Sequence, residues 1–374
     1  MGVFRAGDKN KGYVKVYSKQ GGANWSTMQE IDGKGNWNRF GFSVDLSNSG
    51  SIMAITSLNR TAFVYQLSGS TSQYEEIFSE DCKAREVAVS SNGKVIAVAL
   101  DDSNGNIGAK IFERNGATFQ QRSTFSRIGK SGGIALSRDG STLIFSDRDG
   151  RGRVWVYKWD DDQESWDRLG DVFRGDNSND MLGFGECVSI TRNGRIISIG
   201  APRYDQNGRN KGLVRVYEYK PNQNRWNQIG DDLIGDNAQD RFSTNALSYD
   251  GTYLIVGAHG GDGADYLKIF KKNGNNYGQI GTNIIGEGGQ FAYAVDMSRD
   301  GSKFVVGSNL PNDDEGKVYL YGSPPTGSGN GGKHHDITNG YISTCVCIYI
   351  YIYTHQIFQT VHRSAFHHIC WYHL

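Results

Sequence analysis

Short apolar runs alternate with polar turns along the first 321 residues, and this arrangement repeats. In the clearest unit, residues 183–230, the apolar run FGECVSI is followed by the turn TRNG and the β-branched run RIISIG. A polar loop leads to LVRVYEY at 213–219, which alternates with the period of a half-buried strand, and PNQN separates it from WNQIG. The pattern predicts four antiparallel strands joined by hairpins, and no convincing amphipathic helix in residues 1–330.

A turn phrase marks the same place in six such units. It consists of an apolar residue, Ser or Thr, two residues of which the second is usually Asp or Asn, and Gly. The turn glycines lie 43 to 57 residues apart, a period that is typical of a β-propeller with four-stranded blades. We expect each Gly to adopt positive φ and each Asx side chain to bond the backbone two residues on. The six phrases are LSNSG, VSSNG, LSRDG, ITRNG, LSYDG and MSRDG, ending at Gly50, Gly93, Gly140, Gly194, Gly251 and Gly301.

Aromatic residues recur at fixed places in the units. The predicted third strand occurs seven times, from YVKVY at 13–17 to KVYLY at 317–321, and every copy ends on an aromatic residue. We interpret these rings as core between adjacent blades, in preference to a surface that stacks on ligands. The predicted fourth strands carry a second set, Trp25, Tyr74, Phe119, Trp166, Trp226 and Tyr277.

The strand count predicts an all-β toroid of seven blades, five complete and two partial. The first unit lacks its first strand and most of its second, and the last ends after its third strand at Tyr321. Two explanations stay open: the termini share blades, or an N-terminal piece is missing from the sequence. We favour the second, and place the propeller at residues 1–321.

The last 53 residues differ from the repeats in composition. Residues 322–333, GSPPTGSGNGGK, have the composition of a flexible linker. The run CVCIYIYIYTH at 345–355 can be encoded by an unbroken alternating dinucleotide tract, so we expect residues 334–374 to be a disordered tail of translated noncoding sequence. This tail holds seven of the eight His and three of the five Cys, in no spacing typical of a zinc finger, and no metal site is predicted.

Composition excludes several classes of partner. The chain has 40 Lys+Arg and 40 Asp+Glu, a balance that argues against nucleic acid and anionic membranes. No run reaches the length of a membrane span, and the N-terminus has no apolar core of a signal peptide. Cys82 and Cys187 alone make no disulfide framework. We expect a monomer without cofactors; the compartment stays open, with an extracellular or cell-surface location favoured if the N-terminus is incomplete.

Phe184-Gly185 and Gly200-Ala201-Pro202 resemble the two halves of the FG-GAP repeat of integrin-α-type β-propellers, and Phe40-Gly41 repeats the first half. The resemblance covers about residues 1–321, and LSRDG with its following strand also resembles WD40-type blades. Integrin-type blades often carry D-x-D-x-D-G calcium loops, whereas this chain has S-x-D/N-G. One carboxylate cannot supply the six to eight oxygens that Ca²⁺ prefers, so calcium binding is not expected.

In the family that the chain resembles, loops from second to third strands share one face with the loops between blades. In this chain those loops vary most, at 101–108, 202–211, 260–265 and 309–315. Variable loops on a constant frame are typical of binding surfaces, and the 202–211 loop combines both charge signs with an aromatic residue. The candidate binding residues are Arg203, Tyr204, Asp205, Arg209, Asp101, Asp102, Asp262 and Asp313.

The sequence therefore predicts a non-catalytic interaction or scaffold propeller that binds a protein or glycan through its loop face. No catalytic residue is assigned, because His259 is the only His in residues 1–330. One alternative is a carbohydrate-active enzyme that uses two converging carboxylates; a channel pocket lined by acidic residues would favour it, and an open loop face would favour the binder. Another is an ectodomain fragment of an adhesion receptor.

Overall fold

The computed structural model describes residues 2–3, 12–18, 26–34, 39–57, 61–100, 108–126, 131–147, 150–185, 187–206, 209–260, 265–286, 290–309, 317–322 and 334–336. Across these residues the chain forms strands and turns, with one 3-10 turn, η1 (Pro221–Gln223), as their helical element. No helix in these ranges is long and apolar enough to span a membrane. The fold class is therefore all-β, as the pattern of apolar positions predicts.

Six sheets each contain four main strands that pair antiparallel in chain order, and they are called blades 1 to 6. Blades 1 to 3 comprise β4 (Phe40–Leu46), β5 (Ile52–Ser57), β6 (Thr61–Leu67) and β7 (Tyr74–Asp81); β8 (Ala84–Val89), β9 (Val95–Leu100), β10 (Ala109–Asn115) and β11 (Thr118–Thr124); and β12 (Ser131–Leu136), β13 (Thr142–Asp147), β14 (Arg153–Asp160) and β15 (Ser165–Arg168).

Blades 4 to 6 follow the same plan. They comprise β17 (Val188–Ile190), β18 (Ile196–Ala201), β19 (Leu213–Lys220) and β20 (Arg225–Gln228); β22 (Thr244–Leu247), β23 (Tyr253–Ala258), β24 (Tyr266–Asn273) and β25 (Asn276–Gln279); and β27 (Gln290–Met297), β28 (Lys303–Asn309), β29 (Lys317–Gly322) and β30 (His334–Asp336). Three two-residue strands, β16 (Phe173–Arg174), β21 (Leu233–Ile234) and β26 (Ile284–Ile285), pair with the third strands of blades 3, 4 and 5.

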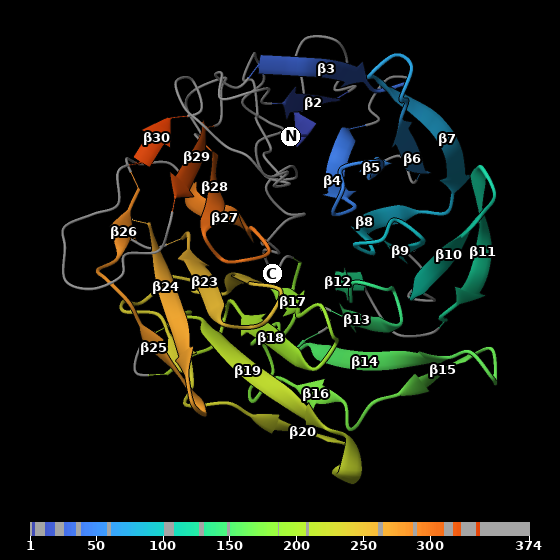
Figure 1. Ribbon diagram of the computed structural model, residues 1–374. Coiled ribbons are helices and arrows are strands. Elements are labelled where there is room, and N and C mark those ends of the chain that lie inside the picture. The colour runs from blue at the N-terminus through green and yellow to red at the C-terminus, as the bar shows by residue number, and fades with distance from the viewer. Residues whose placement is uncertain are drawn as a thin grey trace, which may run out of the picture.

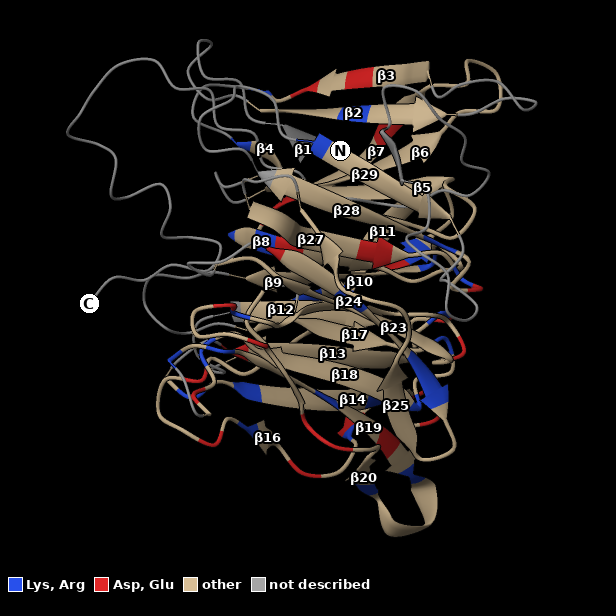
Figure 2. Cartoon of the chain, turned by 90° about the vertical axis from the view of Figure 1, so that its left-hand side faces the viewer, with Lys and Arg blue, Asp and Glu red and all other residues tan. Residues whose placement is uncertain are grey.

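The blades are arranged in a ring with their first strands innermost (Figure 1). Neighbouring first strands contact one another in the order β4, β8, β12, β17, β22 and β27. A three-stranded N-terminal sheet, β1 (Gly2–Val3), β2 (Tyr13–Ser18) and β3 (Ser26–Asp32), contacts β4 and lies between blades 1 and 6 in Figure 1. Seen edge-on in Figure 2, many of the charged residues lie in the loops on either side of the strands.

The blade count corrects the sequence prediction. The structure has six four-stranded blades, so the predicted count of seven is wrong, and the last blade is complete because β30 pairs with β29. β30 lies in the segment predicted to be a disordered tail, and residues 323–333 and 337–374 lie outside the described residues. The sequence pattern missed β30 because an outermost strand needs only backbone pairing along one edge, and His334–Asp336 has no alternating apolar pattern.

The six turn phrases form the hairpins between the first and second strands. In each, the Ser or Thr hydroxyl accepts the backbone N–H five residues on, as Ser137 does from Thr142 at 2.9 Å. The fourth side chain accepts the N–H two residues on, as Asp139 does from Ser141 at 2.9 Å. All six glycines have positive φ, 75° at Gly140. These contacts confirm the predicted roles of the Gly and Asx residues.

The hydrophobic core lies between adjacent sheets. One cluster joins Val214 and Val216 of blade 4 to Tyr266, Phe270 and Tyr277 of blade 5, and similar clusters join the other described neighbours from the N-terminal sheet to blade 6. The described third- and fourth-strand aromatics other than Tyr17 fall in or against these clusters, which confirms their predicted structural role; Trp25 lies outside the described residues. Burial of such rings between sheets stabilises the ring of blades.

Candidate functional site

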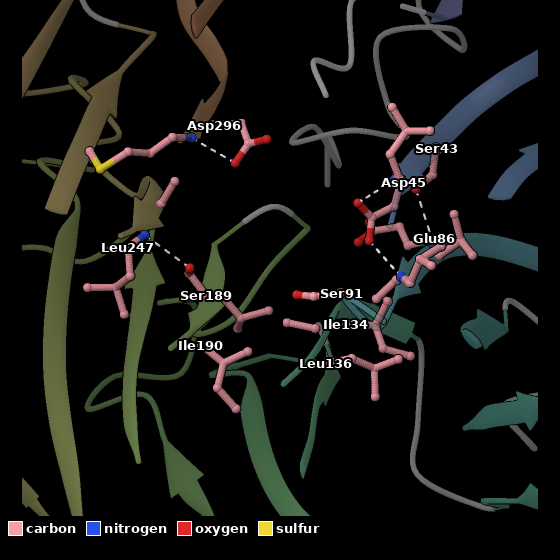
Figure 3. Close-up of a pocket in the computed structure, with 18 of the residues that line it drawn as sticks. Ser43, Asp45, Glu86, Ser91, Ile134, Leu136, Ser189, Ile190, Leu247 and Asp296 are labelled. Atoms are coloured by element: carbon pink, nitrogen blue, oxygen red, sulfur yellow. Dashed lines mark hydrogen bonds between the residues drawn. The ribbon is translucent and has the colours of Figure 1, made fainter. Parts of the chain in front are cut away.

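A cavity of about 270 Å³ lies on the axis of the ring, lined by the first strands of all six blades and the hairpins that follow them. Successive first strands are linked across it: Val87 N–H donates to Ser43 Oγ at 3.1 Å, and Leu247 N–H donates to Ser189 Oγ at 3.1 Å (Figure 3). These side chains therefore both line the channel and hold neighbouring blades in register.

Two carboxylates occupy equivalent places in the channel wall. Asp45 of β4 and Asp296 of β27 each stand two residues before the Ser of a turn phrase, and both face the cavity (Figure 3). The other four blades have Ala or Ser at this place. One apolar residue follows this place in each blade and also lines the channel: Leu46, Val89, Leu136, Ile190, Leu247 and Met297.

Asp45 lies in a desolvated environment. Burial raises the pKa of Asp45 to about 7, and the charge of Asp296 acts in the same direction. Hydrogen bonds from Val89 N–H at 2.6 Å and Leu46 N–H at 2.7 Å oppose the rise. A carboxyl that titrates near neutral pH can give or take a proton, so this group is the strongest candidate for acid–base chemistry in the channel.

One mouth of the channel is formed by the third residue of each of the six turn phrases. These side chains all line the cavity, and we call the set the turn ring: Asn48, Ser91, Arg138, Arg192, Tyr249 and Arg299. Backbone hydrogen bonds connect it from blade to blade, with Arg138 N–H donating to the Arg192 carbonyl at 3.2 Å and Arg192 N–H to the Tyr249 carbonyl at 2.9 Å. The positions of these residues are therefore set by the ring itself.

The opposite end of the channel holds a buried arginine. Arg85 is 4% exposed, its guanidinium lies 5.4 Å from the Phe42 ring centroid, and its Nε lies 3.9 Å from a carboxylate oxygen of Glu86. All three residues line the cavity. The channel thus carries both charge signs at this end, and two carboxyl groups in its middle.

Four of the predicted binding residues share one loop on the face opposite the turns, between β18 and β19. Tyr204 packs against the cluster between blades 3 and 4, with the Arg215 guanidinium 5.9 Å from its ring centroid. Asp205 accepts the Asn210 N–H at 2.5 Å, and the Arg209 carbonyl accepts the Gln239 N–H at 2.7 Å. Arg203 is half-buried, whereas Asp205 and Arg209 are exposed.

The other predicted binding residues, Asp101, Asp102, Asp262 and Asp313, lie outside the described residues, so their role stays a prediction. The acidic loops between blades are described. Asp180 and Asp240 are buried and accept the N–H groups of Asn177 at 2.6 Å and Asn237 at 2.7 Å, respectively. These two carboxylates hold the shape of their own loops and are not available to a ligand.

His259 does not line the channel. It is 2% exposed, and its Nδ1 lies 3.4 Å from Thr244 Oγ1. Burial lowers the pKa of His259 to about 3, with the charge of Arg241 adding to the effect, so the ring is neutral at ordinary pH. In the ranges that the structure describes, no group of three or more His, Cys, Asp and Glu residues could hold a metal ion.

Sequence reasoning missed the channel residues. The signal was present in two forms. SVDLS and AVDMS place Asp45 and Asp296 identically before their turns, and the third position of the turn phrase varies widely while the second is Ser or Thr and the fourth is Ser, Asn or Asp. Nothing in one sequence says that these positions from different blades converge. Only closure of the ring brings them together.

No protein-family model matches the sequence, and no curated protein matches it. Solved β-propellers do match the structure. Pseudomonas aeruginosa periplasmic gluconolactonase PpgL has a TM-score of 0.64 and 16% identity, with 90% of this chain and 94% of that chain covered. The β-propeller domain of Myceliophteria thermophila Cps50 (Swd1) has a TM-score of 0.52 and 11% identity, with 75% and 82% covered.

Kuenenia stuttgartiensis hydrazine synthase also matches, with a TM-score of 0.52 and 13% identity over 75% of this chain and 76% of that chain. At such identities the likenesses show the propeller fold alone. They include an enzyme that bears the name gluconolactonase, so the fold is compatible with catalysis as well as with binding. The resemblance to FG-GAP repeats stays a prediction.

Proposed function

We propose that this chain is a non-catalytic interaction propeller that binds a protein or glycan partner through the loop face of blades 3 to 5. The observation that carries the proposal is the cross-linking of loops from successive blades into one continuous surface. Arg203 N–H donates to the Asp180 carbonyl at 3.3 Å, and the Asn210 side chain donates to Gln239 Oε1 at 3.0 Å. A surface held in this way loses little conformational entropy when a partner binds.

Charged clusters reinforce the same surface. The Arg215 guanidinium bonds Asp232 at 2.7 and 2.8 Å and Asp176 at 2.7 and 3.2 Å, and the hydrogen bonds of Asp232 raise the pKa of Arg215. Lys268 bonds Asp236 at 2.5 Å in the next blade. These side chains are already paired, whereas Asp205 and Arg209 are exposed charges of the same surface that a partner can reach.

The test begins with a glycan array and a cross-linking pull-down of the full chain to obtain a ligand. R203A/R209A should then weaken binding by about tenfold or more, because charged contacts at an interface centre contribute most of its affinity. Arg195→Ala, an exposed arginine beside the turns, is the matched control. Binding that survives R203A/R209A, or that is lost with EGTA, would contradict the proposal.

The second candidate is a carbohydrate-active enzyme that works in the channel. The observation in its favour is the pair Asp45 and Asp296 in one cavity, with the pKa of Asp45 raised to about 7 by burial. A pair of carboxyl groups, one of them with a raised pKa, is the general arrangement for acid–base hydrolysis of sugar derivatives.

Assays with sugar lactones and aryl glycosides between pH 5 and 8 separate this candidate from the binder. Turnover that is lost in both D45N and D296N would favour the enzyme. Wild-type protein without turnover, which nevertheless binds a partner through Arg203 and Arg209, would favour the interaction propeller.

A further inference from the structure

The turn ring carries three arginines, Arg138, Arg192 and Arg299, around the mouth of a channel that the loop-face proposal does not use. They come from blades 3, 4 and 6, so they approach the channel axis from different sides. Hydrogen bonds between the backbones of successive turns hold their Cα positions, including Tyr249 N–H to the Arg299 carbonyl at 3.1 Å. Preorganised cations of this kind are typical of an anion site.

In the part of the chain that the structure describes, these guanidinium groups are not paired with a carboxylate. Within the described ranges, no carboxylate forms an ion pair with Arg138, Arg192 or Arg299. The acidic residues next to them in sequence are occupied by their own turns: Asp139 accepts from Ser137, at 2.8 Å, and from Ser141, and Asp300 is held in the same way. Asp139 and Asp300 do not line the cavity, whereas the three arginines do, so the positive groups of these turns are the ones that face the mouth.

Neutral hydrogen-bonding groups share the mouth with the arginines. Tyr249 reaches across it from blade 5, with its hydroxyl 3.1 Å from Ser91 Oγ of blade 2 and 3.5 Å from Asn48 Oδ1 of blade 1. The Arg299 guanidinium lies 5.1 Å from the Tyr249 ring centroid. A ligand at the mouth would therefore meet hydroxyl donors as well as guanidinium donors.

The interior of the channel determines how a ligand is oriented. Asp45 and Asp296 repel an anionic group but accept hydrogen bonds from hydroxyls, and Ile134, Leu136 and Ile190 offer apolar contact around them (Figure 3). The anionic group must therefore stay at the mouth, while an uncharged hydroxylated part enters the channel. A cavity of about 270 Å³ limits this part to a small molecule.

We propose that the turn-ring mouth of the channel binds a small phosphate monoester, with its phosphate among Arg138, Arg192 and Arg299 and its hydroxylated part beside Asp45 and Asp296. A phosphate dianion presents three terminal oxygens in a tetrahedral arrangement, which donors from several sides can contact together. A planar carboxylate is satisfied by one bidentate guanidinium. The site is separate from the loop face, so the two proposals stand or fall independently.

Titration calorimetry of the full chain with glycerol 3-phosphate tests the proposal, with glycerol and glycerate as uncharged and carboxylate counterparts. Glycerol 3-phosphate should bind more tightly than glycerate, and glycerol should not bind measurably. Each lost guanidinium contact should cost about tenfold in affinity, so R138Q/R192Q should bind about a hundredfold more weakly.

Arg195→Gln is the matched control, because this arginine follows the blade 4 turn directly but does not line the cavity. It should bind glycerol 3-phosphate as the wild type does. A wild type that does not bind glycerol 3-phosphate at millimolar concentration, or an R138Q/R192Q variant that melts like wild type and keeps its affinity, would overturn the proposal. Glycerate that binds as tightly as glycerol 3-phosphate would overturn its phosphate preference.

Discussion

Individual side chains between the blades combine ring packing with a hydrogen bond to the backbone. Tyr277 is 4% exposed, and its hydroxyl donates to the Gly251 carbonyl at 2.5 Å. Trp226 packs 5.1 Å from the Tyr219 ring and donates its Nε1–H to the Leu169 carbonyl of the preceding blade at 3.0 Å. A polar atom on an aromatic ring thus finds a partner where the ring is covered.

Trp226→Ala should lower the free energy of unfolding by about 3 kcal/mol, because it removes a ring from the contact between blades 3 and 4 and the Nε1–H bond with it. Urea denaturation monitored by circular dichroism measures the change. Trp226→Phe, which keeps a ring but not the donor, should lose less. Unchanged stability of the alanine variant together with loss of binding to a partner would instead make Trp226 a contact residue.

Asp45 should make stability depend on pH. Its pKa is about 7 in the folded chain and about 4 in the unfolded chain, so the folded state binds more protons between these values. Stability from this group is therefore lost as pH rises from about 4 to about 7. The free energy of unfolding of D45N relative to wild type should rise over that window. Asp265, whose pKa is also raised to about 7, contributes equally to both proteins; parallel pH profiles would contradict the prediction.

At the scale of the element, the hairpins of blades 2 to 6 pack their turn glycines against the preceding blade. A Cβ at Gly140, whose φ is 75°, would lie 2.5 Å from Val95 Cβ of blade 2. Gly116 in the β10–β11 hairpin has a φ of 62°, but a Cβ there would meet nothing within 4 Å. A substitution at Gly116 therefore tests only the positive φ that the turn requires. A substitution at Gly140 tests that requirement together with packing against the neighbouring blade.

Gly116→Ala should cost about 1–2 kcal/mol, the ordinary cost of a non-glycine residue at positive φ. Gly140→Ala should cost about 1–3 kcal/mol more, because the methyl group also displaces a buried valine. Chemical denaturation of the two variants side by side gives the comparison. Equal losses would mean that the turn repeats are required for backbone conformation alone and not for packing between blades.

At the scale of the molecule, the outer edge of blade 6 depends on β30. Tyr319, Leu320 and Tyr321 of β29 are buried, and β30 pairs with the same three residues. An unpaired edge at this place would leave backbone donors and acceptors of a buried strand without their ladder partners.

A chain that ends at Asp336 should melt within a few degrees of the full chain. A chain that ends at Gly322 lacks β30 and should melt lower, by about 1–2 °C for each kcal/mol of lost stability in a domain of this size. Differential scanning calorimetry of the two truncations measures the difference. Equal melting temperatures would show that β30 adds no stability and would restore the sequence prediction of a dispensable tail after residue 333.

The repeat and its turn chemistry are local properties, so the amino-acid order was sufficient to predict them. A Ser hydroxyl, an Asx side chain and a Gly at fixed spacing close the same hairpin wherever they occur, as Ser137, Asp139 and Gly140 do. Period-two alternation likewise identified the strands and the aromatic core positions, because each depends on neighbours along one strand. The alternation pattern did not identify the strand at His334–Asp336, which pairs with β29. This strand completes the last blade, and the number of four-stranded blades is therefore six.

The channel depends on contacts between residues far apart in the chain, and for that reason it emerged only with the folded ring. Tyr249 meets Ser91 across 158 residues, and Asp45 and Asp296 face one cavity from the first and last blades. The local sequence around each of these side chains shows only a polar residue near the end of a strand. They share a cavity because the six blades are arranged around a common axis. Closure then desolvates Asp45, raises its pKa and gathers the arginines at one mouth, because burial and charge proximity are properties of the assembled ring and not of any single repeat.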